Sequence, residues 1–174
     1  MAILAANQSD IEITKILKVI PKIKSVEGRF QRIGKLKNQS KVILDYAHTP
    51  EALKTCLLNL REQFPNNKIS LLFGCGGNRD QSKRAKMGKI ADNFSDKIYL
   101  TDDNPRFENP NKIRKDIKKE IKKQKVVEIS NRAKAIKEAI KNITIGEILL
   151  VAGKGHEKTQ DIGKQKIYFS DKSI

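Results

Sequence analysis

ILLVAGKGHE, residues 148 to 157, consists of five apolar residues followed at once by a polar loop with two glycines. An unbroken apolar run of this length is typical of a central strand in a parallel sheet, which is buried on both faces. The polar residues after it would then lie at the carboxyl end of the strand, where open α/β sheets bind their ligands. This stretch therefore predicts the fold class and the edge of the sheet that carries a site.

The same pattern recurs on both sides of this run, where short apolar segments alternate with helical periodicity. Strands are predicted at 42–44, 69–73, 98–101, 126–129 and 148–152, and helices at 50–64, 82–94, about 110–123 and 131–142. Pro50 and Pro110 suit the first helical position, and Asn131 or Ser130 is the expected cap of the last helix. We therefore expect an α/β fold with a Rossmann-like, open, mostly parallel sheet and helices on both faces. A weaker strand at 167–169 would pair at an edge.

The first 40 residues lack this alternation. Residues 10–17 predict a capped amphipathic helix, which Pro21 interrupts. Residues 25–40 contain two glycines and several basic residues and are predicted to be a linker. We expect residues 1–24 to be the helical remnant of a preceding domain, and residues 41–174 to form the Rossmann-like domain.

The net charge of +16 would suit a protein that binds nucleic acid or an anionic membrane. Only eight of the 36 basic residues are arginine, and 5% of the chain is aromatic, whereas nucleic-acid recognition favours arginine forks and stacking rings. We therefore expect a solvated lysine-rich surface with no nucleic-acid and no membrane partner. A basic nucleic-acid-binding module remains the alternative.

The two cysteines, Cys56 and Cys75, show no metal-ligand spacing with each other or with His48 and His156. Neither a disulfide framework nor a zinc site is expected. No segment approaches the ~20 apolar residues of a membrane span, and the N-terminus lacks the order of a signal peptide. These features predict a protein of the reducing cytoplasm.

Four of the predicted strands end in polar clusters, at residues 45–50, 74–80, 102–106 and 153–157. Because parallel strands end at one edge of a sheet, the clusters form one active-site candidate. Arg79 and Arg106 could grip a carboxylate or phosphate, and Glu157 or Asp103 could take an ammonium group. That combination suits an amino acid, whose two ends carry opposite charges.

Each cluster also has a purely structural interpretation. Asp45 or Asp103 could cap the next helix, His48 could be an ordinary rim histidine, and the glycines of residues 74–77 could serve a tight turn. Neither the GxGxxG fingerprint nor a GxxxxGK[ST] phosphate loop is present. The residues alone therefore predict an α/β domain that binds a small charged ligand, and an amino-acid-binding regulatory module is a further alternative.

Six motifs occur in the order seen in the Mur ligases: VEGRF at 26–30, DYAHTP at 45–50, FGCGGNRD at 73–80, KRAKMG at 83–88, TDDNPR at 101–106 and VAGKGHE at 151–157. Over nearly its whole length the chain resembles the C-terminal domain of this family, in particular of members that add diaminopimelate. One departure is Asn78, where the family often has Asp.

The resemblance implies an ATP- and Mg²⁺-dependent ligase of peptidoglycan synthesis, which joins diaminopimelate to UDP-MurNAc-L-Ala-D-Glu through an acyl phosphate. In the family the phosphate loop and the magnesium ligands belong to a central domain that this sequence lacks. We therefore expect the chain to be a monomer that is inactive alone, with small-molecule substrates as its only partners.

The resemblance also assigns residues to the two ligands. Positions that contact diaminopimelate match Arg79, Asp103, Asn104, Pro105, Arg106, Gly153 and Glu157. Positions that contact the nucleotide match Arg29, Asp45 and His48, and no catalytic residue or metal ligand falls within this sequence. Pro105 would fix the turn that lets Arg106 fork onto the distal carboxylate of diaminopimelate. Lysine lacks that carboxylate, so its binding would leave the guanidinium unpaired, at a cost on the order of 2 to 5 kcal/mol.

Overall fold

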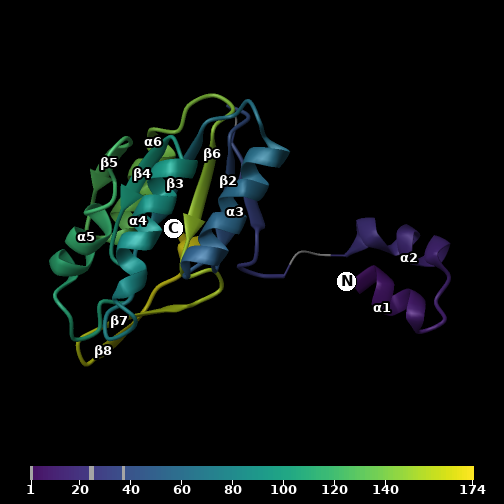
Figure 1. Cartoon of the computed structure of the whole chain (residues 1–174), viewed down its shortest axis with the longest axis horizontal. Coiled ribbons are helices and arrows are strands. Elements are labelled where there is room, and N and C mark those ends of the chain that lie inside the picture. Colours follow the sequence, from purple (N-terminus) through teal and green to yellow (C-terminus); the bar gives the residue numbers. More distant parts are fainter. Residues whose placement is uncertain (1, 24–25, 37) are drawn as a thin grey trace.

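The computed structural model describes residues 2–23, 26–36 and 38–174. Six strands form one sheet in the order β1-β2-β6-β3-β4-β5, in which all neighbours are parallel except β1 and β2. Their bounds are β1 Gln31–Lys35, β2 Lys41–Asp45, β3 Ile69–Phe73, β4 Lys97–Leu100, β5 Lys125–Glu128 and β6 Ile148–Ala152. The predicted Rossmann-like, mostly parallel α/β fold is confirmed (Figure 1).

Four helices cover the two faces of the sheet. One face packs against α3, α4 and α5, and the other packs against α6. Their bounds are α3 Pro50–Gln63, α4 Ser82–Phe94, α5 Pro110–Lys118 and α6 Arg132–Lys141. Strands β3 and β6 are buried along all five residues, as their apolar sequences predict for the middle of the sheet.

Side chains at the carboxyl edge determine where two of the helices begin. The Thr49 hydroxyl accepts the N–H of Ala52 at 3.2 Å, and Asn131 Oδ1 accepts the N–H of Lys134 at 2.9 Å. Each such cap typically stabilises a helix by about 1 kcal/mol. The predicted starts of α3 and α6 are thereby confirmed, and both helices begin close to the loops that carry the candidate site.

Helix α5 ends at Lys118, earlier than the predicted residue 123. The N–H groups of Lys123 and Gln124 donate instead to Asp92 Oδ1 on α4, both at 2.8 Å. The Asp92 carboxylate of α4 therefore binds the backbone that would otherwise have continued α5.

Two strands give no clear sequence signal. Strand β1 lies within residues 25–40, predicted as a linker, of which residues 25 and 37 lie outside the described part. Its sequence, QRIGK, has no apolar run because it is an edge strand with one pairing partner. Strand β7 (Thr159–Ile162) pairs with β8 (Gln165–Tyr168) in a separate two-stranded sheet. The expected pairing of 167–169 at an edge of the main sheet is therefore wrong.

The chain begins with α1 (Ala2–Gln8), α2 (Ile13–Val19) and a single 3-10 turn (Ile20–Lys22). Helix α2 starts at Ile13 without a side-chain cap, so the capped helix predicted from residue 10 is corrected. No residue of α2 is buried, and large apolar side chains of both helices are exposed: Ile3, Leu4, Ile13, Leu17 and Val19. Among the described residues, no helix has the length and apolar character needed to cross a membrane.

Candidate functional site

The loops after β2, β3, β4 and β6 meet at the carboxyl edge of the sheet and surround a cavity of about 520 Å³. Seven of the ten predicted site residues line it: His48, Arg79, Asp103, Asn104, Arg106, Gly153 and Glu157. The structure thus brings the four polar clusters together in one place.

The other three predicted residues, Arg29, Asp45 and Pro105, do not line this cavity. The Asp45 carboxylate accepts the N–H groups of Phe30 at 2.6 Å and Ala47 at 2.7 Å, so it ties the segment before β1 to the loop after β2. Pro105 supplies a carbonyl against the loop after β3 and faces a neighbouring hollow. Asp45 and Pro105 therefore contact the loops that carry the lining residues instead of lining the cavity themselves.

Neither Asp45 nor Asp103 caps the helix that follows it, because Thr49 and Asn109 do so. Asp103 is buried, and its Oδ1 accepts the N–H of Asn104 at 2.7 Å. Its Oδ2 lies against Gly153, where an added Cβ would come within 2.9 Å. Gly153 also has a φ of +110°, which favours glycine.

Arg106 is held at the cavity wall. Its Nη1 donates to the carbonyl of Gly77 at 2.9 Å and to that of Asn104 at 3.4 Å, and its Nε lies 3.9 Å from Asp161 Oδ2. Its main chain bonds to the β7–β8 hairpin: its N–H donates to the Asp161 carbonyl at 3.0 Å, and its carbonyl accepts from Gly163 at 2.7 Å. The side chain is 23% exposed and faces the same cavity as Arg79 and Glu157.

The loop after β3 and the loop after β4 are interlocked through their backbones. The N–H of Gly77 donates to the carbonyl of Asn104 at 2.8 Å, and the N–H of Phe107 donates to Asn78 Oδ1 at 3.0 Å. A Cβ on Gly77 would lie 2.0 Å from the Pro105 carbonyl oxygen, so the contact requires glycine. Asn78 has φ 51°, which asparagine tolerates well, and its side chain keeps the acceptor that Phe107 uses.

A fully buried arginine on α4 supports both loops. Arg84 donates to Glu108 Oε2 at 2.7 Å, to Asp116 Oδ2 at 3.2 Å and to the Gly76 carbonyl at 3.4 Å. Glu108 also accepts the backbone N–H of Asn78. The hydrogen bond from Arg84, and then that from Asn78, hold the pKa of Glu108 below its ordinary value of 4.5.

Asn104 and Glu157, from two different loops, meet at the floor of the cavity, where Asn104 Nδ2 donates to Glu157 Oε2 at 3.1 Å. Burial acts to raise the pKa of Glu157. The hydrogen bond and charge of Lys154 outweigh it, together with hydrogen bonds from Asn104 and Tyr46, so the pKa lies below its ordinary value. Glu157 is therefore an anion at neutral pH.

An aromatic cluster forms one side of the cavity, which Tyr46 and His48 line. The Arg29 guanidinium sits 4.7 Å from the centroid of the Tyr46 ring, which is 4.5 Å from the His48 ring and 5.2 Å from the His156 ring. Nδ1 of His48 is 2.8 Å from the Tyr46 carbonyl oxygen. In the described residues no group of three or more His, Cys, Asp or Glu side chains is placed to hold a metal ion.

Several residues that organise the site were not predicted: Tyr46, Arg84, Glu108, Lys154 and Asp161. Tyr46, Arg84 and Lys154 fall inside the quoted motifs DYAHTP, KRAKMG and VAGKGHE, so the motifs were the available signal. No sequence pattern pointed to Glu108 or Asp161.

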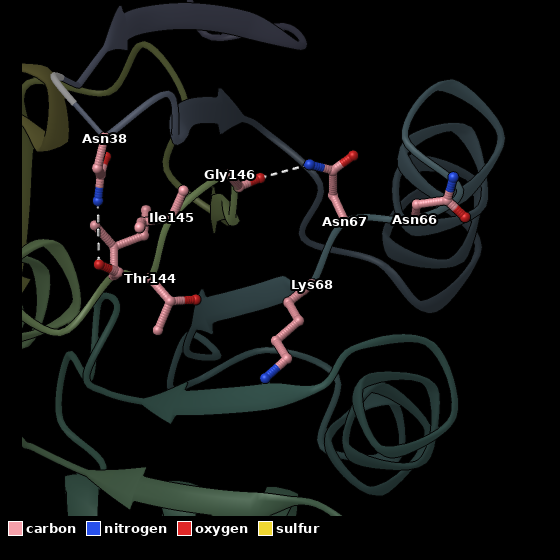
Figure 2. A pocket seen from close by; sticks show the side chains of 8 residues that line it. Asn38, Asn66, Asn67, Lys68, Thr144, Ile145 and Gly146 are labelled. Atoms are coloured by element: carbon pink, nitrogen blue, oxygen red, sulfur yellow. Dashed lines mark hydrogen bonds between the residues drawn. The ribbon is translucent and has the colours of Figure 1, made fainter.

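A larger hollow, of about 640 Å³, opens at the opposite, amino edge of the sheet (Figure 2). Asn38 and Asn67 point at backbone carbonyls there, with Nδ2 donating to Ile143 at 3.3 Å and to Gly146 at 2.6 Å, respectively. Among its lining residues Lys68 alone is charged. The cavity at the carboxyl edge is therefore the candidate site, because it presents charged groups of both signs.

Comparison with known protein families matches residues 28–155 to the family described as Mur ligase, glutamate ligase domain. The chain belongs to the Mur ligase family. The UDP-N-acetylmuramoyl-L-alanyl-D-glutamate–2,6-diaminopimelate ligase of Buchnera aphidicola is 45% identical over 175 residues, which cover 100% of this chain and 34% of that relative. The ligase of the same name from Rickettsia bellii is 43% identical over 167 residues, or 95% of this chain and 34% of the relative.

A solved structure of a ligase of this name matches this Mur ligase chain with a TM-score of 0.78 at 36% identity, over 98% of this chain and 35% of the other. The family predicted from six motifs is thereby confirmed. The chain spans about a third of the length of these Mur ligase relatives.

Proposed function

We propose that this chain is the amino-acid-recognising part of an ATP-dependent ligase that adds diaminopimelate to UDP-MurNAc-L-Ala-D-Glu in peptidoglycan synthesis. The observation that carries the proposal is the charge arrangement of the carboxyl-edge cavity, where Arg79 and Arg106 share one space with Asp103 and Glu157. Diaminopimelate carries two carboxylates and two ammonium groups, so the basic and the acidic residues of the cavity each have a partner on the ligand. Relatives that bear this ligase's name, and that are similar over all or nearly all of the chain, support the choice of amino acid.

Arg106 is the residue we assign to the distal carboxylate. Within the described part of the chain its Nη2 has no hydrogen-bond partner, while Nη1 is oriented by the Gly77 carbonyl. A carboxylate can therefore bind at Nη2 while the Gly77 and Asn104 carbonyls stay on Nη1. Arg79 would contribute a second cation, while Asp103, Asn104, the Gly153 carbonyl and Glu157 would receive the amino-acid end of the ligand.

Selectivity against lysine follows from the partial burial of Arg106. Losing a charged partner costs on the order of 2 to 5 kcal/mol at a desolvated site, and the 23% exposure of Arg106 places the cost near the lower end. About 2 kcal/mol corresponds to roughly 30-fold weaker binding of lysine.

We assign the nucleotide to the aromatic side of the site. Arg29 and His48 flank the Tyr46 ring, which offers a flat surface for a base, while Asp45 holds Phe30 and thereby keeps its neighbour Arg29 in place. ATP phosphates and Mg²⁺ would be held mainly by the central domain of the full-length ligase. There the bound metal and ATP would supply phosphoryl transfer to the D-glutamyl carboxylate.

The helices at the start of the chain would belong to that central domain, and residues 25–40 would join it to the domain of residues 41–174 while contributing the edge strand β1 to that domain's sheet. Their exposed apolar side chains support this assignment, because the relatives are about three times as long and hold further chain to cover them. The chain alone would be a catalytically silent monomer, and the full ligase a cytoplasmic enzyme without nucleic-acid or membrane partners. Neither a nucleic-acid-binding nor a regulatory module gains support from the comparisons.

Calorimetry with the purified chain tests the proposal. We expect weak binding of diaminopimelate, binding of lysine about 30-fold weaker, and loss of this preference in Arg106→Ala. Arg61→Ala, at the opposite edge of the sheet, is the matched control and should leave both affinities unchanged. Equal binding of the two amino acids by the wild type, or binding unchanged in Arg106→Ala, would refute the assignment. Affinity for oligonucleotides that falls steeply with salt would favour the nucleic-acid alternative.

A further inference from the structure

Lys154 is fully buried beneath the cavity floor and is not one of the residues that line the cavity. Lysine is almost never fully buried unless it is paired, because removing its ammonium group from water is costly. Here Nζ donates to Glu157 Oε2 at 2.9 Å and to Asn104 Oδ1 at 3.0 Å. Both partners are cavity residues that come from different loops, so Lys154 bridges the two walls that would receive the amino-acid end of a ligand.

The backbone of the loop directs Lys154 inward. Gly153 and Gly155, on either side of it, have φ values of +110° and +53°, conformations that favour glycine. A Cβ on Gly155 would lie 2.7 Å from the Gly28 carbonyl oxygen, so this turn is also packed against the segment before β1. The Glu157 N–H donates to the Lys154 carbonyl at 2.9 Å and closes the turn. The two glycines thus place an acid and its cation on one short loop.

Lys154 also determines how the Asn104 amide is oriented. Oδ1 of Asn104 accepts two donors, Nζ of Lys154 and the backbone N–H of Asp161 at 3.0 Å. With its oxygen fixed in this way, the amide must turn Nδ2 toward Glu157. A flipped amide would place its NH₂ group against both donors and lose all three hydrogen bonds.

We infer that Lys154 is a positioning residue of the amino-acid site, which holds Asn104 in one amide orientation and keeps the Glu157 carboxylate aimed at the ligand's ammonium group. The inference rests on the proposed function for the identity of the ligand. The hydrogen-bond geometry around Lys154 does not depend on that function. A purely structural ion pair would also shift the titration of Glu157, but its removal would weaken the fold and leave ligand binding by the folded protein unchanged.

Other charged or titratable groups also act on Glu157 or share its cavity, and any change in its titration must be measured against them. They come from the loops after β2, β3 and β4 and from α4 and α6: Tyr46, His48, Cys75, Arg79, Asp80, Lys83, Asp103, Arg106 and Arg132. Among the cations near Glu157, Lys154 is the one that hydrogen-bonds to the Glu157 carboxylate. Removing Lys154 should therefore have a larger effect on Glu157 than removing a cation elsewhere.

Lys154→Met, which keeps a long unbranched side chain and removes the charge, is the test variant. Carboxyl NMR titration should show Glu157 below its ordinary pKa in the wild type and at a clearly higher pKa in Lys154→Met, because burial is then opposed by the hydrogen bonds from Asn104 and Tyr46 without the charge of Lys154. Arg61→Met is the matched control: it also removes one positive charge, from an arginine at the opposite edge of the sheet that pairs with Asp96, and it should not move Glu157. An unchanged Glu157 titration in Lys154→Met overturns the inference.

Ligand binding gives the second measurement. Diaminopimelate should bind Lys154→Met about 10- to 100-fold more weakly, with the loss growing as the pH falls from 8 to 5.5, whereas wild-type affinity stays flat over that range. In Glu157→Gln, adding Lys154→Met should weaken binding little further; fully additive losses contradict the inference. If Glu157 shifts as expected but neither the wild type nor Lys154→Met binds diaminopimelate, the proposed function fails, and what stands is the effect of Lys154 on Glu157 and Asn104. If Lys154→Met does not fold, the wild-type titration still decides, since an ordinary or raised pKa of Glu157 overturns the inference.

Discussion

Replacing Arg84 with methionine should destabilise the protein and loosen the cavity at the same time. Arg84 is fully buried, and its three bonds join α4 to Glu108, Asp116 and the Gly76 carbonyl. Breaking a buried ion pair by removing one partner costs about 3 to 5 kcal/mol, because the other charge is left behind. Glu108 and Asp116 keep 15% and 19% exposure, and Lys119 lies 2.8 Å from Asp116, so the loss should be near 3 kcal/mol.

A loss of about 3 kcal/mol in a chain of this length lowers the melting temperature by roughly 6 to 12 °C. Denaturant unfolding and calorimetry measure the two quantities directly. Arg61→Met serves as the control, since the Arg61–Asp96 pair is 32% and 43% exposed and should contribute about 1 kcal/mol or less. A free-energy loss in Arg84→Met no larger than that of the control would refute the buried-support interpretation.

The same variant should show a particular pH dependence. Glu108 has a folded-state pKa below its ordinary value of 4.5, chiefly because of Arg84. Such a group contributes stability that is fully present above the unfolded pKa and is lost as the pH falls through the folded one. The difference in unfolding free energy between wild type and Arg84→Met should therefore be constant from pH 8 to 6 and shrink below pH ~4.5. A difference that grows in acid would contradict this assignment of the charge.

Two further predictions concern packing. Gly88→Ala in α4 should gain about 1 kcal/mol of helix propensity. The new Cβ would lie 2.0 Å from the Ile117 carbonyl oxygen of α5, so the variant should still destabilise the protein by about 2 kcal/mol net. An unchanged or raised melting temperature would contradict this. Burial raises the pKa of both Cys56 and Cys75 to about 12, so at pH 8 their thiolate fraction should be roughly 1,000-fold below that of free cysteine. Iodoacetamide should therefore label them far more slowly in the native protein than in guanidinium chloride, and rapid native labelling of Cys75 would show that the cavity floor opens.

Regular features of the fold could be read from the sequence because they rest on local periodicity. Strand β6 was identifiable from five consecutive apolar residues, and the shared edge of the polar loops followed from parallel strands with helical crossovers. Strands β1 and β7 were missed, since QRIGK and TQDI are polar and acquire strand character only from the neighbour they pair with. Short edge strands of this kind give little sequence signal.

The position of the candidate site at the carboxyl edge of the sheet could also be predicted, because it follows from the same local periodicity. Arg79, Arg106 and Glu157 lie in loops that follow parallel strands, so their convergence follows from topology. The supports of the site are different: Arg84 is one of several basic residues in the first turns of α4, and Glu108 looks like a surface acid. Their roles depend on which way a side chain points once the domain is packed, and that information is not contained in the spacing of residues along the chain.

The antiparallel direction of β1 decides where the rest of a longer polypeptide would be attached. Because Gln31 pairs beside Leu44 and Lys35 beside Lys41, the chain enters the sheet at its carboxyl edge and not at its base. A module tethered upstream would thereby be delivered to the carboxyl edge, beside the cavity in which we propose that the amino acid and the nucleotide bind. Had the edge strand run the other way, the same tether would have had to cross the full height of the sheet.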